Sequence, residues 1–344
     1  MSSRRFASLL VMSALAVSPM WAQALAKAAS TGAKTYTAPR TPDSQPDLQG
    51  IWDAASMTPL ERPVELGNKA FYTPEEVIAY EQKRAHDLDR DRRDGSADAD
   101  LARAYNDSWF DRGAHLGSNR RTSRIIDPAN GRFPAFTPEA AKKFKDVHDW
   151  LAIHANDGPE TRELYDRCLV FSQSGPPYIA GNYNNLYQIV QTSGMVAILS
   201  EMGHQVRPVP LVSNAAAAKN HPFSNVRQWQ GESVGYWEGD TLVVETTNFR
   251  TSDHTRFGVQ YEGMSDEHLH VTERFTRTAP DTLIYRATVV DLSVYSQPWT
   301  IELPMGKTSN PIYEYACHEG NYGLAGILSG ARAAEKNRTL ENRR

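Results

Sequence analysis

The stretch from 235 to 249 constrains the fold of this chain more than any other part of it. The turn Glu238-Gly239-Asp240 is followed by the run Thr241–Thr247, which is rich in β-branched residues. A short glycine-containing loop between two runs of this kind is the usual signal of a β-hairpin. The stretch therefore predicts two neighbouring antiparallel strands.

Runs of the same character recur on both sides of this hairpin. They are Leu186–Thr192, Met195–Met202, His268–Thr278, Thr282–Asp291, Trp299–Pro304 and Ile312–His318. Short turns separate them and no helical crossover intervenes, so we expect the strands to pair antiparallel. The sequence predicts a mainly β fold over residues 161–332, either an antiparallel β-barrel or a strongly curved sheet.

Residues 46–160 predict a helical and irregular wrap around this barrel. One helix is expected to begin at Thr73-Pro74 with a capping box closed by Glu76, and another at Thr137-Pro138. The second helix should reach about Ala155 and pack one face on the sheet, because four of its residues recur at three- and four-residue spacing. They are Phe144, Val147, Leu151 and His154. Residues 333–344 are expected to be a polar tail.

The first 24 residues have the form of a secretory signal peptide. Arg4 and Arg5 precede the apolar run Phe6–Trp21, and Ala22-Gln23-Ala24 follows it. The apolar run is shorter than the roughly 18 to 20 residues that a membrane span needs. We therefore expect a periplasmic or secreted protein with no membrane span in its mature form, beginning with a flexible leader over 25–45.

Charge and cysteine content limit the partners and the chemistry. The formal net charge is −4, which argues against a nucleic-acid partner, because phosphate backbones attract basic surfaces. The two cysteines, Cys168 and Cys317, predict a disulfide in an exported chain. The alternative is that Cys317 is a nucleophile beside His318.

Five strings of sequence carry a resemblance to a known group of proteins. They are Arg167–Phe171, Gly181–Gln191, Trp237–Phe249, His268–Phe275 and Tyr313–Tyr322. Together they resemble a large family of exported bacterial proteins that are generally labelled hypothetical, over about Pro46 to Arg332. The resemblance implies export and a single folded unit, and it implies no reaction. The rhythm of the β-rich part is similar to that of lipocalin-like barrels, at the level of fold only.

Side chains alternate faces along a strand, so the run 268–275 divides into two sets. Leu269, Val271, Glu273 and Phe275 share one face, and His268, His270, Thr272 and Arg274 share the other. We expect the polar set to line the barrel lumen, with His270 as the acid/base group and Arg274 holding an anionic group. Glu273, beside Arg274, is expected to form an ordinary structural ion pair, and its replacement by Ala to leave a buried partner unpaired.

Other polar residues on the predicted strands could join His270 in general acid/base catalysis. The candidate catalytic residues are His270, Glu201, Glu245, His204 and His318. Aromatic rings offer flat walls to a sugar or an aromatic substrate, and polar side chains can orient it. The candidate substrate-binding residues are Arg274, Arg207, Trp237, Trp299, Tyr183, Tyr187, Asn321 and Glu319. The competing interpretation is that the aromatics are core and the charges are ion pairs.

A metal site at His268-x-His270 is an alternative, with His318 or Glu319 as a further ligand. We expect no metal and no cofactor, since the sequence also lacks a phosphate-binding glycine loop, a nucleophile elbow and a zinc-protease motif. The sequence thus predicts an exported lyase or hydrolase acting on a small polar organic molecule, a saccharide or an oxygenated aromatic. The alternative is a non-catalytic, lipocalin-like protein that binds a small molecule.

Overall fold

The computed structural model describes residues 36–89, 91, 95–102, 110–221, 226–250 and 268–341. Residues 37–344 belong to one compact unit. The predicted signal peptide and most of the predicted leader lie outside the described residues.

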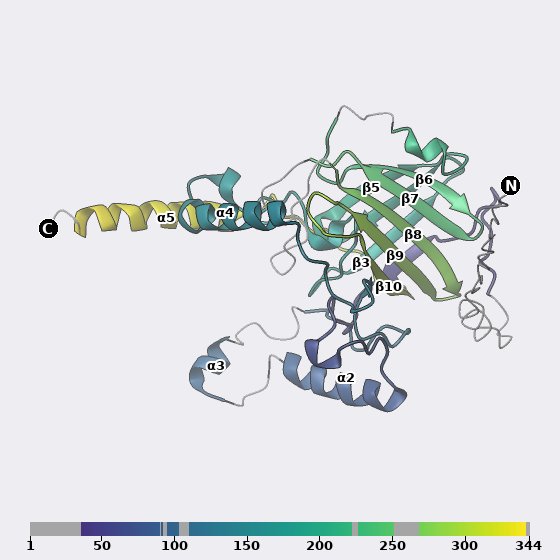
Figure 1. Cartoon of the computed structure of the whole chain (residues 1–344), viewed down its shortest axis with the longest axis horizontal. Helices are drawn as coiled ribbons and strands as arrows, with labels where there is room; N and C mark the ends of the chain where they lie inside the picture. The colour runs from purple at the N-terminus through teal and green to yellow at the C-terminus, as the bar shows by residue number, and fades with distance from the viewer. Residues whose placement is uncertain are drawn as a thin grey trace, which may run out of the picture. The chain divides into compact units, whose positions relative to one another are not determined.

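The described residues form a mainly antiparallel β structure, which confirms the predicted fold class (Figure 1). Nine strands follow one another across the sheet in the order β5-β4-β3-β1-β10-β9-β8-β7-β6, and β2 pairs with β10 beside this path. The strands are β1 Gly50–Asp53, β2 Ile125–Asp127, β3 Leu186–Gln191, β4 Met195–Ser200, β5 Gln205–Pro210, β6 Glu232–Glu238, β7 Thr241–Thr247, β8 His270–Ala279, β9 Thr282–Val290 and β10 Trp299–Thr308.

The two ends of this sheet meet and make it a nearly closed barrel. Just beyond β5, Leu211 forms a bridge with Gly235 of β6, and the N–H of Val212 donates to the Gly235 carbonyl at 2.8 Å. A Cβ on Gly235 would lie 2.7 Å from the Val209 side chain, so glycine permits this close approach. In the predicted hairpin, Glu238 pairs with Thr241 around the turn, where Gly239 has a φ of 59°.

Helices lie before and after the strands. They are η1 Val64–Leu66, α2 Pro74–Leu88, α3 Ala97–Ala102, α4 Pro138–His154, η3 Pro159–Thr161, η4 Ser172–Ser174, η5 Met202–His204, η6 Ala217–Lys219 and α5 Tyr322–Glu341. Both predicted helix starts are confirmed, because Thr73 and Glu76 form a capping box on α2 and Thr137 caps α4. Among the described residues, no helix has the length and apolarity that crossing a membrane requires.

The barrel interior is filled with side chains. Large residues from β3, β8 and β9 meet there, with ring centroids 5.0 Å apart for Phe275 and Tyr285. The segment 172–180 enters the same core, and its Tyr178 lies 4.6 Å from Tyr187 and 5.5 Å from Tyr285 between ring centroids. The N–H of Tyr178 donates to the Tyr285 hydroxyl at 2.9 Å. The centre of the barrel is therefore packed protein.

The predicted wrap contacts the outer face of the barrel through a buried carboxylate. Glu302 of β10 accepts hydrogen bonds from Asn119 and Arg121 at 2.8 Å each, and from Nε of Arg286 on β9 at 2.6 Å. Burial disfavours the charged form of Glu302, yet these hydrogen bonds outweigh it and lower the pKa of the carboxyl. Arg121 of the coil thus binds a protein carboxylate on the sheet.

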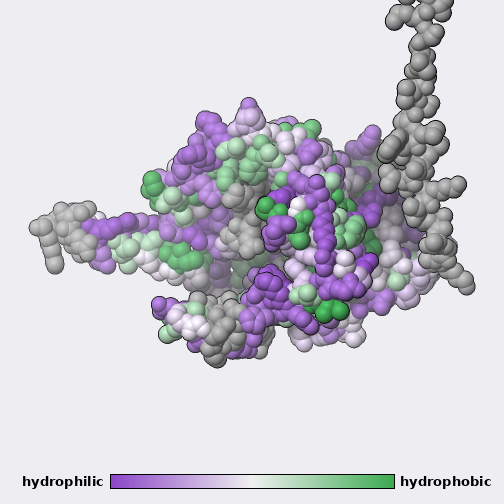
Figure 2. Space-filling view, turned by 60° about the horizontal axis from the view of Figure 1, so that its bottom comes forward, coloured by the Kyte–Doolittle hydropathy of each residue, from purple (hydrophilic) through white to green (hydrophobic). Residues whose placement is uncertain are grey.

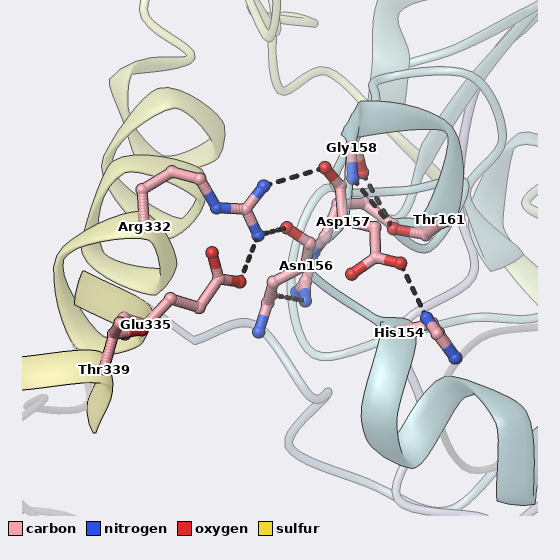
Figure 3. Close-up of polar contacts among 9 residues, drawn as sticks. His154, Asn156, Asp157, Gly158, Thr161, Arg332, Glu335 and Thr339 are labelled. Carbon is pink, nitrogen blue, oxygen red and sulfur yellow. Dashed lines mark hydrogen bonds and ion pairs between the residues drawn. The ribbon is translucent and has the colours of Figure 1, made fainter. Parts of the chain in front are cut away.

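The C-terminal part of the chain differs from the prediction. Residues 312–318 form no strand, and helix α5 occupies much of the predicted polar tail. The predicted disulfide is present, with 5.8 Å between the Cα atoms of Cys168 and Cys317. In α5, Arg332 donates to the carbonyls of Asn156 and Asp157 at 2.8 and 3.0 Å, which ties this helix to the turn after α4 (Figure 3).

Helix α4 does not bury the face that its sequence predicts. Ala140 is its only buried residue, and the four residues of the predicted packing face are half-buried. Trp150 and Ile153 are exposed on the same helix. Other hydrophobic residues form separate groups between hydrophilic ones on the face shown in Figure 2. The reason is that the barrel core is completed by segment 172–180, so α4 is left at the surface.

Candidate functional site

The two faces of β8 are assigned the opposite way to the prediction. Val271, Glu273 and Phe275 are buried in the barrel interior, whereas His270 and Arg274 each leave 41% of the side chain exposed on the outer face. The expectation that the polar set lines a lumen is therefore wrong. The apolar face turns inward because burial of apolar side chains stabilises the folded protein. The barrel therefore has a packed core and not a hollow lumen.

Arg207, predicted to bind substrate, lies inside this core. Its guanidinium binds both carboxylate oxygens of Glu273, with NH2 2.9 Å from Oε1, and its Nε is 3.1 Å from the Tyr178 hydroxyl. The Tyr285 hydroxyl donates to Glu273 at 2.9 Å. Both charges are paired and buried, so Glu273 forms a structural ion pair as predicted. Its partner is Arg207 and not Arg274, because Arg274 lies on the opposite face of β8 and pairs with Glu238.

On the outer face, the structure brings together two predicted catalytic residues from neighbouring strands. Nε2 of His270 on β8 lies 2.8 Å from Oε2 of Glu245 on β7. Thr272 donates to the same oxygen at 2.8 Å, and the Tyr236 hydroxyl lies 3.4 Å from Oε1. The alternation of side chains along β7 and β8 places all of these groups on one face.

The hydrogen bonds of this pair favour the charged form of Glu245 and orient the His270 ring. Burial opposes the charge on Glu245, but the hydrogen bonds from His270 and Thr272 outweigh it and lower the pKa of the carboxyl. A carboxylate only accepts hydrogen bonds, so the Nε2 atom of His270 carries the shared proton. In the neutral imidazole Nδ1 then keeps a lone pair, and it has no hydrogen-bond partner among the described residues. This arrangement can take a proton from a bound molecule.

A second imidazole and carboxylate lie beside this pair. Nδ1 of His221 is 3.8 Å from Oε2 of Glu232 on β6, and Asn248 donates to that oxygen at 2.7 Å. Burial lowers the pKa of His221, and the charge of Glu232 opposes that shift. Both side chains are more than nine-tenths buried, with 9% and 7% exposed. Neither His221 nor Glu232 is among the residues predicted from the sequence.

The strand register places the two pairs on adjacent rows of one surface. Glu232 pairs with Thr247, and Val234 pairs with Glu245, so the two glutamates are diagonal neighbours on β6 and β7. Thr247 lies one residue beyond the Thr246–Val271 pair, which brings it next to His270. Neighbouring strands are about 4.8 Å apart, so the backbones carrying Glu232 and His270 are about 10 Å apart, on either side of Thr247.

The coil segment 212–221 packs on the outer face of β6 and β7 beside these pairs. Ala218 and Val212 pack on Val234, Tyr236 and Val243, a small apolar cluster on the outer face of β6 and β7. Burial raises the pKa of Tyr236 to about 12, so its hydroxyl stays protonated near neutral pH. The segment 212–221 is thereby held on the sheet and carries His221 to Glu232.

The remaining predicted catalytic residues lie away from these pairs. Glu201 is buried just after β4, where its carboxylate accepts long hydrogen bonds from the N–H groups of Leu186 and Tyr313 at 3.4 and 3.3 Å. His204 and His318 are exposed. The predicted convergence of these three residues with His270 in one lumen is wrong, because they lie after β4 or in the segment before α5 and not on the outer face of β6–β8.

The predicted substrate-binding residues are also dispersed. Trp299 and Tyr187 are buried core residues, and Trp237 packs partly buried against the same core. Asn321 caps α5 by accepting from the Leu324 N–H at 3.1 Å, while Glu319 and Tyr183 are exposed. Arg274 remains on the outer face, where its NH2 lies 2.8 Å from Glu238. The aromatic residues at strand spacing are thus mostly core.

A pocket and a search for metal ligands add no chemistry to these pairs. The pocket, of ≈ 690 Å³, lies beside α4, and its lining includes Val147, Trp150, Leu151 and Thr161 but none of the predicted site residues. Among the described residues, no group of three or more histidine, cysteine, aspartate and glutamate side chains is arranged to hold a metal ion.

We compared the chain with protein-family models, with curated proteins and with solved structures, and none of the three comparisons found a match. The interpretation of the site therefore depends on its geometry.

One sequence signal could have found Glu232. Once the hairpin turn is fixed, Glu238 opposite Thr241 sets the register and places Glu232 diagonal to Glu245 on the same face. His221 has no comparable signal, because it precedes β6 in irregular coil and reaches the sheet only through the packing of Ala218.

Proposed function

We propose that the protein is an exported enzyme that uses the Glu245–His270 pair as a general acid/base site on a small polar organic molecule. The observation that carries this proposal is the 2.8 Å contact between Nε2 of His270 and Oε2 of Glu245. In such a contact the carboxylate orients the imidazole and stabilises the imidazolium that forms when the other nitrogen takes a proton.

The surroundings of the pair suit proton transfer. Thr272 and Tyr236 hold the carboxylate of Glu245 in place, and 41% of the His270 side chain remains open to solvent and to a substrate. A saccharide or an oxygenated aromatic is the proposed substrate class, and the proposed reaction is an elimination or a hydrolysis. The resemblance to exported bacterial proteins and the disulfide support a periplasmic or secreted location.

Arg274 is the proposed contact for an anionic group of the substrate. It lies on the same face of β8 as His270, four residues along the strand, and its exposed guanidinium is shared with Glu238 at 2.8 Å. A substrate carboxylate would compete with Glu238 for the guanidinium, which binds carboxylates through two parallel hydrogen bonds.

The experiment is a screen of the purified mature protein against polysaccharide fragments and lignin-type aromatics, with detection of both binding and product. The proposal predicts product with at least one substrate class, and loss of product in His270→Ala. Saturable binding without product would favour a non-catalytic binding protein. The matched control is His115→Ala, because His115 forms an exposed contact of 3.2 Å with Glu81 outside the site.

A further inference from the structure

The imidazole of His221 is an unused polar group next to the proposed site. Its Nδ1 is buried and has no hydrogen-bond partner among the described residues, although a carboxylate oxygen of Glu232 lies 3.8 Å away. That distance is too long for a hydrogen bond. Buried polar atoms in proteins nearly always have a partner, so a nitrogen without one marks a place where a bound molecule can supply it.

Glu232 is held ready for such a molecule. Asn248 donates to its Oε2 at 2.7 Å, from the end of β7, and His221 approaches the same oxygen from the covering segment. The Asn248 amide therefore orients the carboxylate, and the imidazole lies on its other side without a hydrogen bond to it. Its row on the sheet continues through Thr247 towards His270, so both imidazoles border the same stretch of surface.

We infer that His221 and Glu232 form a second proton-transferring pair, which faces the Glu245–His270 pair across Thr247 in a single site. This inference rests on the proposed function and adds the requirement that the reaction moves two protons. A substrate lying over Thr247 would meet one imidazole on each side.

Two pairs satisfy the proton accounting of the proposed reactions. In an elimination, one imidazole takes a proton from a carbon next to a carbonyl or carboxylate, and the C–H electron pair becomes a C=C bond. The C–O bond at the next carbon breaks, its electrons go to the oxygen, and the other imidazole, as imidazolium, gives that oxygen a proton. In a hydrolysis the first proton comes from water as its oxygen attacks. Each route needs one basic and one acidic group on opposite sides of the substrate.

The titration of one imidazole should respond to the carboxylate of the other pair. The groups that act on His221 are Glu232 of β6, Glu245 of β7 and His270 of β8. Removing the charge of Glu245 removes an influence that raises the pKa of His221, so that pKa should fall although Glu245 belongs to the other pair.

The test is a pH titration of the mature protein with ¹⁵N-labelled histidine, followed by NMR, for the wild type, Glu245→Gln and Glu238→Gln. Glu238 is the matched control, because it is an exposed carboxylate on the same outer face. We expect Glu245→Gln to lower the pKa of His221 and Glu238→Gln to leave it unchanged. An unchanged His221 pKa in Glu245→Gln would show two independent pairs and overturn the inference.

Kinetic measurements distinguish failure of this inference from failure of the proposed function. On a substrate that the wild type converts, Glu232→Gln and His221→Gln should each lower kcat by at least about 10-fold, within the range for loss of one acid/base group. Full activity in both variants, with His270→Ala inactive, refutes the second pair and leaves the first. Full activity in His270→Ala refutes the proposed function itself.

Discussion

Arg207 of β5 and Glu273 of β8 form a two-pronged ion pair inside the barrel. Because β5 meets β6 where the barrel closes, β6 and β7 separate the two strands, and the pair joins two walls of the barrel through its interior. Tyr178 and Tyr285 complete the hydrogen bonding of the two charged groups. A charged pair with every partner satisfied is a permissible core element, and loss of one member leaves the other buried and unpaired.

Replacement of Glu273 by Ala should therefore destabilise the fold by about 3–5 kcal/mol, the range for breaking a buried pair. The free energy of unfolding from urea denaturation measures this loss. The matched variant is Arg207→Met combined with Glu273→Leu, which removes both charges and should recover much of the stability. If Glu273→Ala alone lowers the free energy of unfolding by less than about 1 kcal/mol, water must solvate the remaining Arg207 charge. That result would contradict the packed core described above.

The disulfide should be present in protein purified without reductant. Cys168 and Cys317 are 149 residues apart in sequence, and a loop of that size corresponds to about 5 kcal/mol on the chain-entropy model. Mass spectrometry of non-reduced peptides should find the two cysteines joined, and Cys168→Ser with Cys317→Ser should lower the midpoint of thermal unfolding. Two free thiols in freshly purified protein would contradict this and restore Cys317 as a candidate reactive group.

Glu302 should make stability depend on acidic pH. Its pKa in the folded state is lowered, because hydrogen bonds from Arg121, Arg286 and Asn119 outweigh the effect of burial. A carboxyl with a lowered folded pKa stabilises the protein above its unfolded pKa, near 4.3, and this contribution is lost as the pH falls through the folded value. Glu302→Gln should thus be less stable than the wild type at neutral pH.

The difference between the two proteins should shrink below about pH 4, where the wild-type carboxyl begins to take up a proton. Urea denaturation of both proteins at neutral and at acidic pH measures it. A difference in the free energy of unfolding that stays constant over this range would show that the contribution of Glu302 to the stability of the protein does not depend on its charge.

Local sequence signals predicted several elements correctly. The hairpin followed from a glycine turn between β-branched runs, and α2 from Thr73 and Glu76, because these features act within a few residues. Strand β5 escaped prediction because it contains Pro208 and Pro210, which remove backbone donors, although proline is tolerated near a sheet edge. Helix α5 escaped because glycines interrupt its sequence, including Gly326 and Gly330.

The candidate site was predicted only in part, since alternation sorts side chains into two faces without showing which one is buried. The choice between Glu273 and His270 depended on whether the barrel is hollow. Segment 172–180 fills it, and no periodicity near Tyr178 indicates that this coil enters the interior. The pairing of Glu245 with His270 needed the register between β7 and β8, which a hairpin signal does not supply because a long connection separates these strands.

The most direct test of the account is the rate of His270→Ala on a substrate that the wild type converts. We expect kcat to fall at least about 100-fold, the lower range for loss of a general acid/base group. The unfolding midpoint should change little, since the His270 side chain is 41% exposed, and the His115→Ala control should keep the wild-type rate. Full activity in His270→Ala, together with a folded but inactive Glu273→Ala, would place the chemistry inside the barrel and contradict the assignment of the site to its outer face.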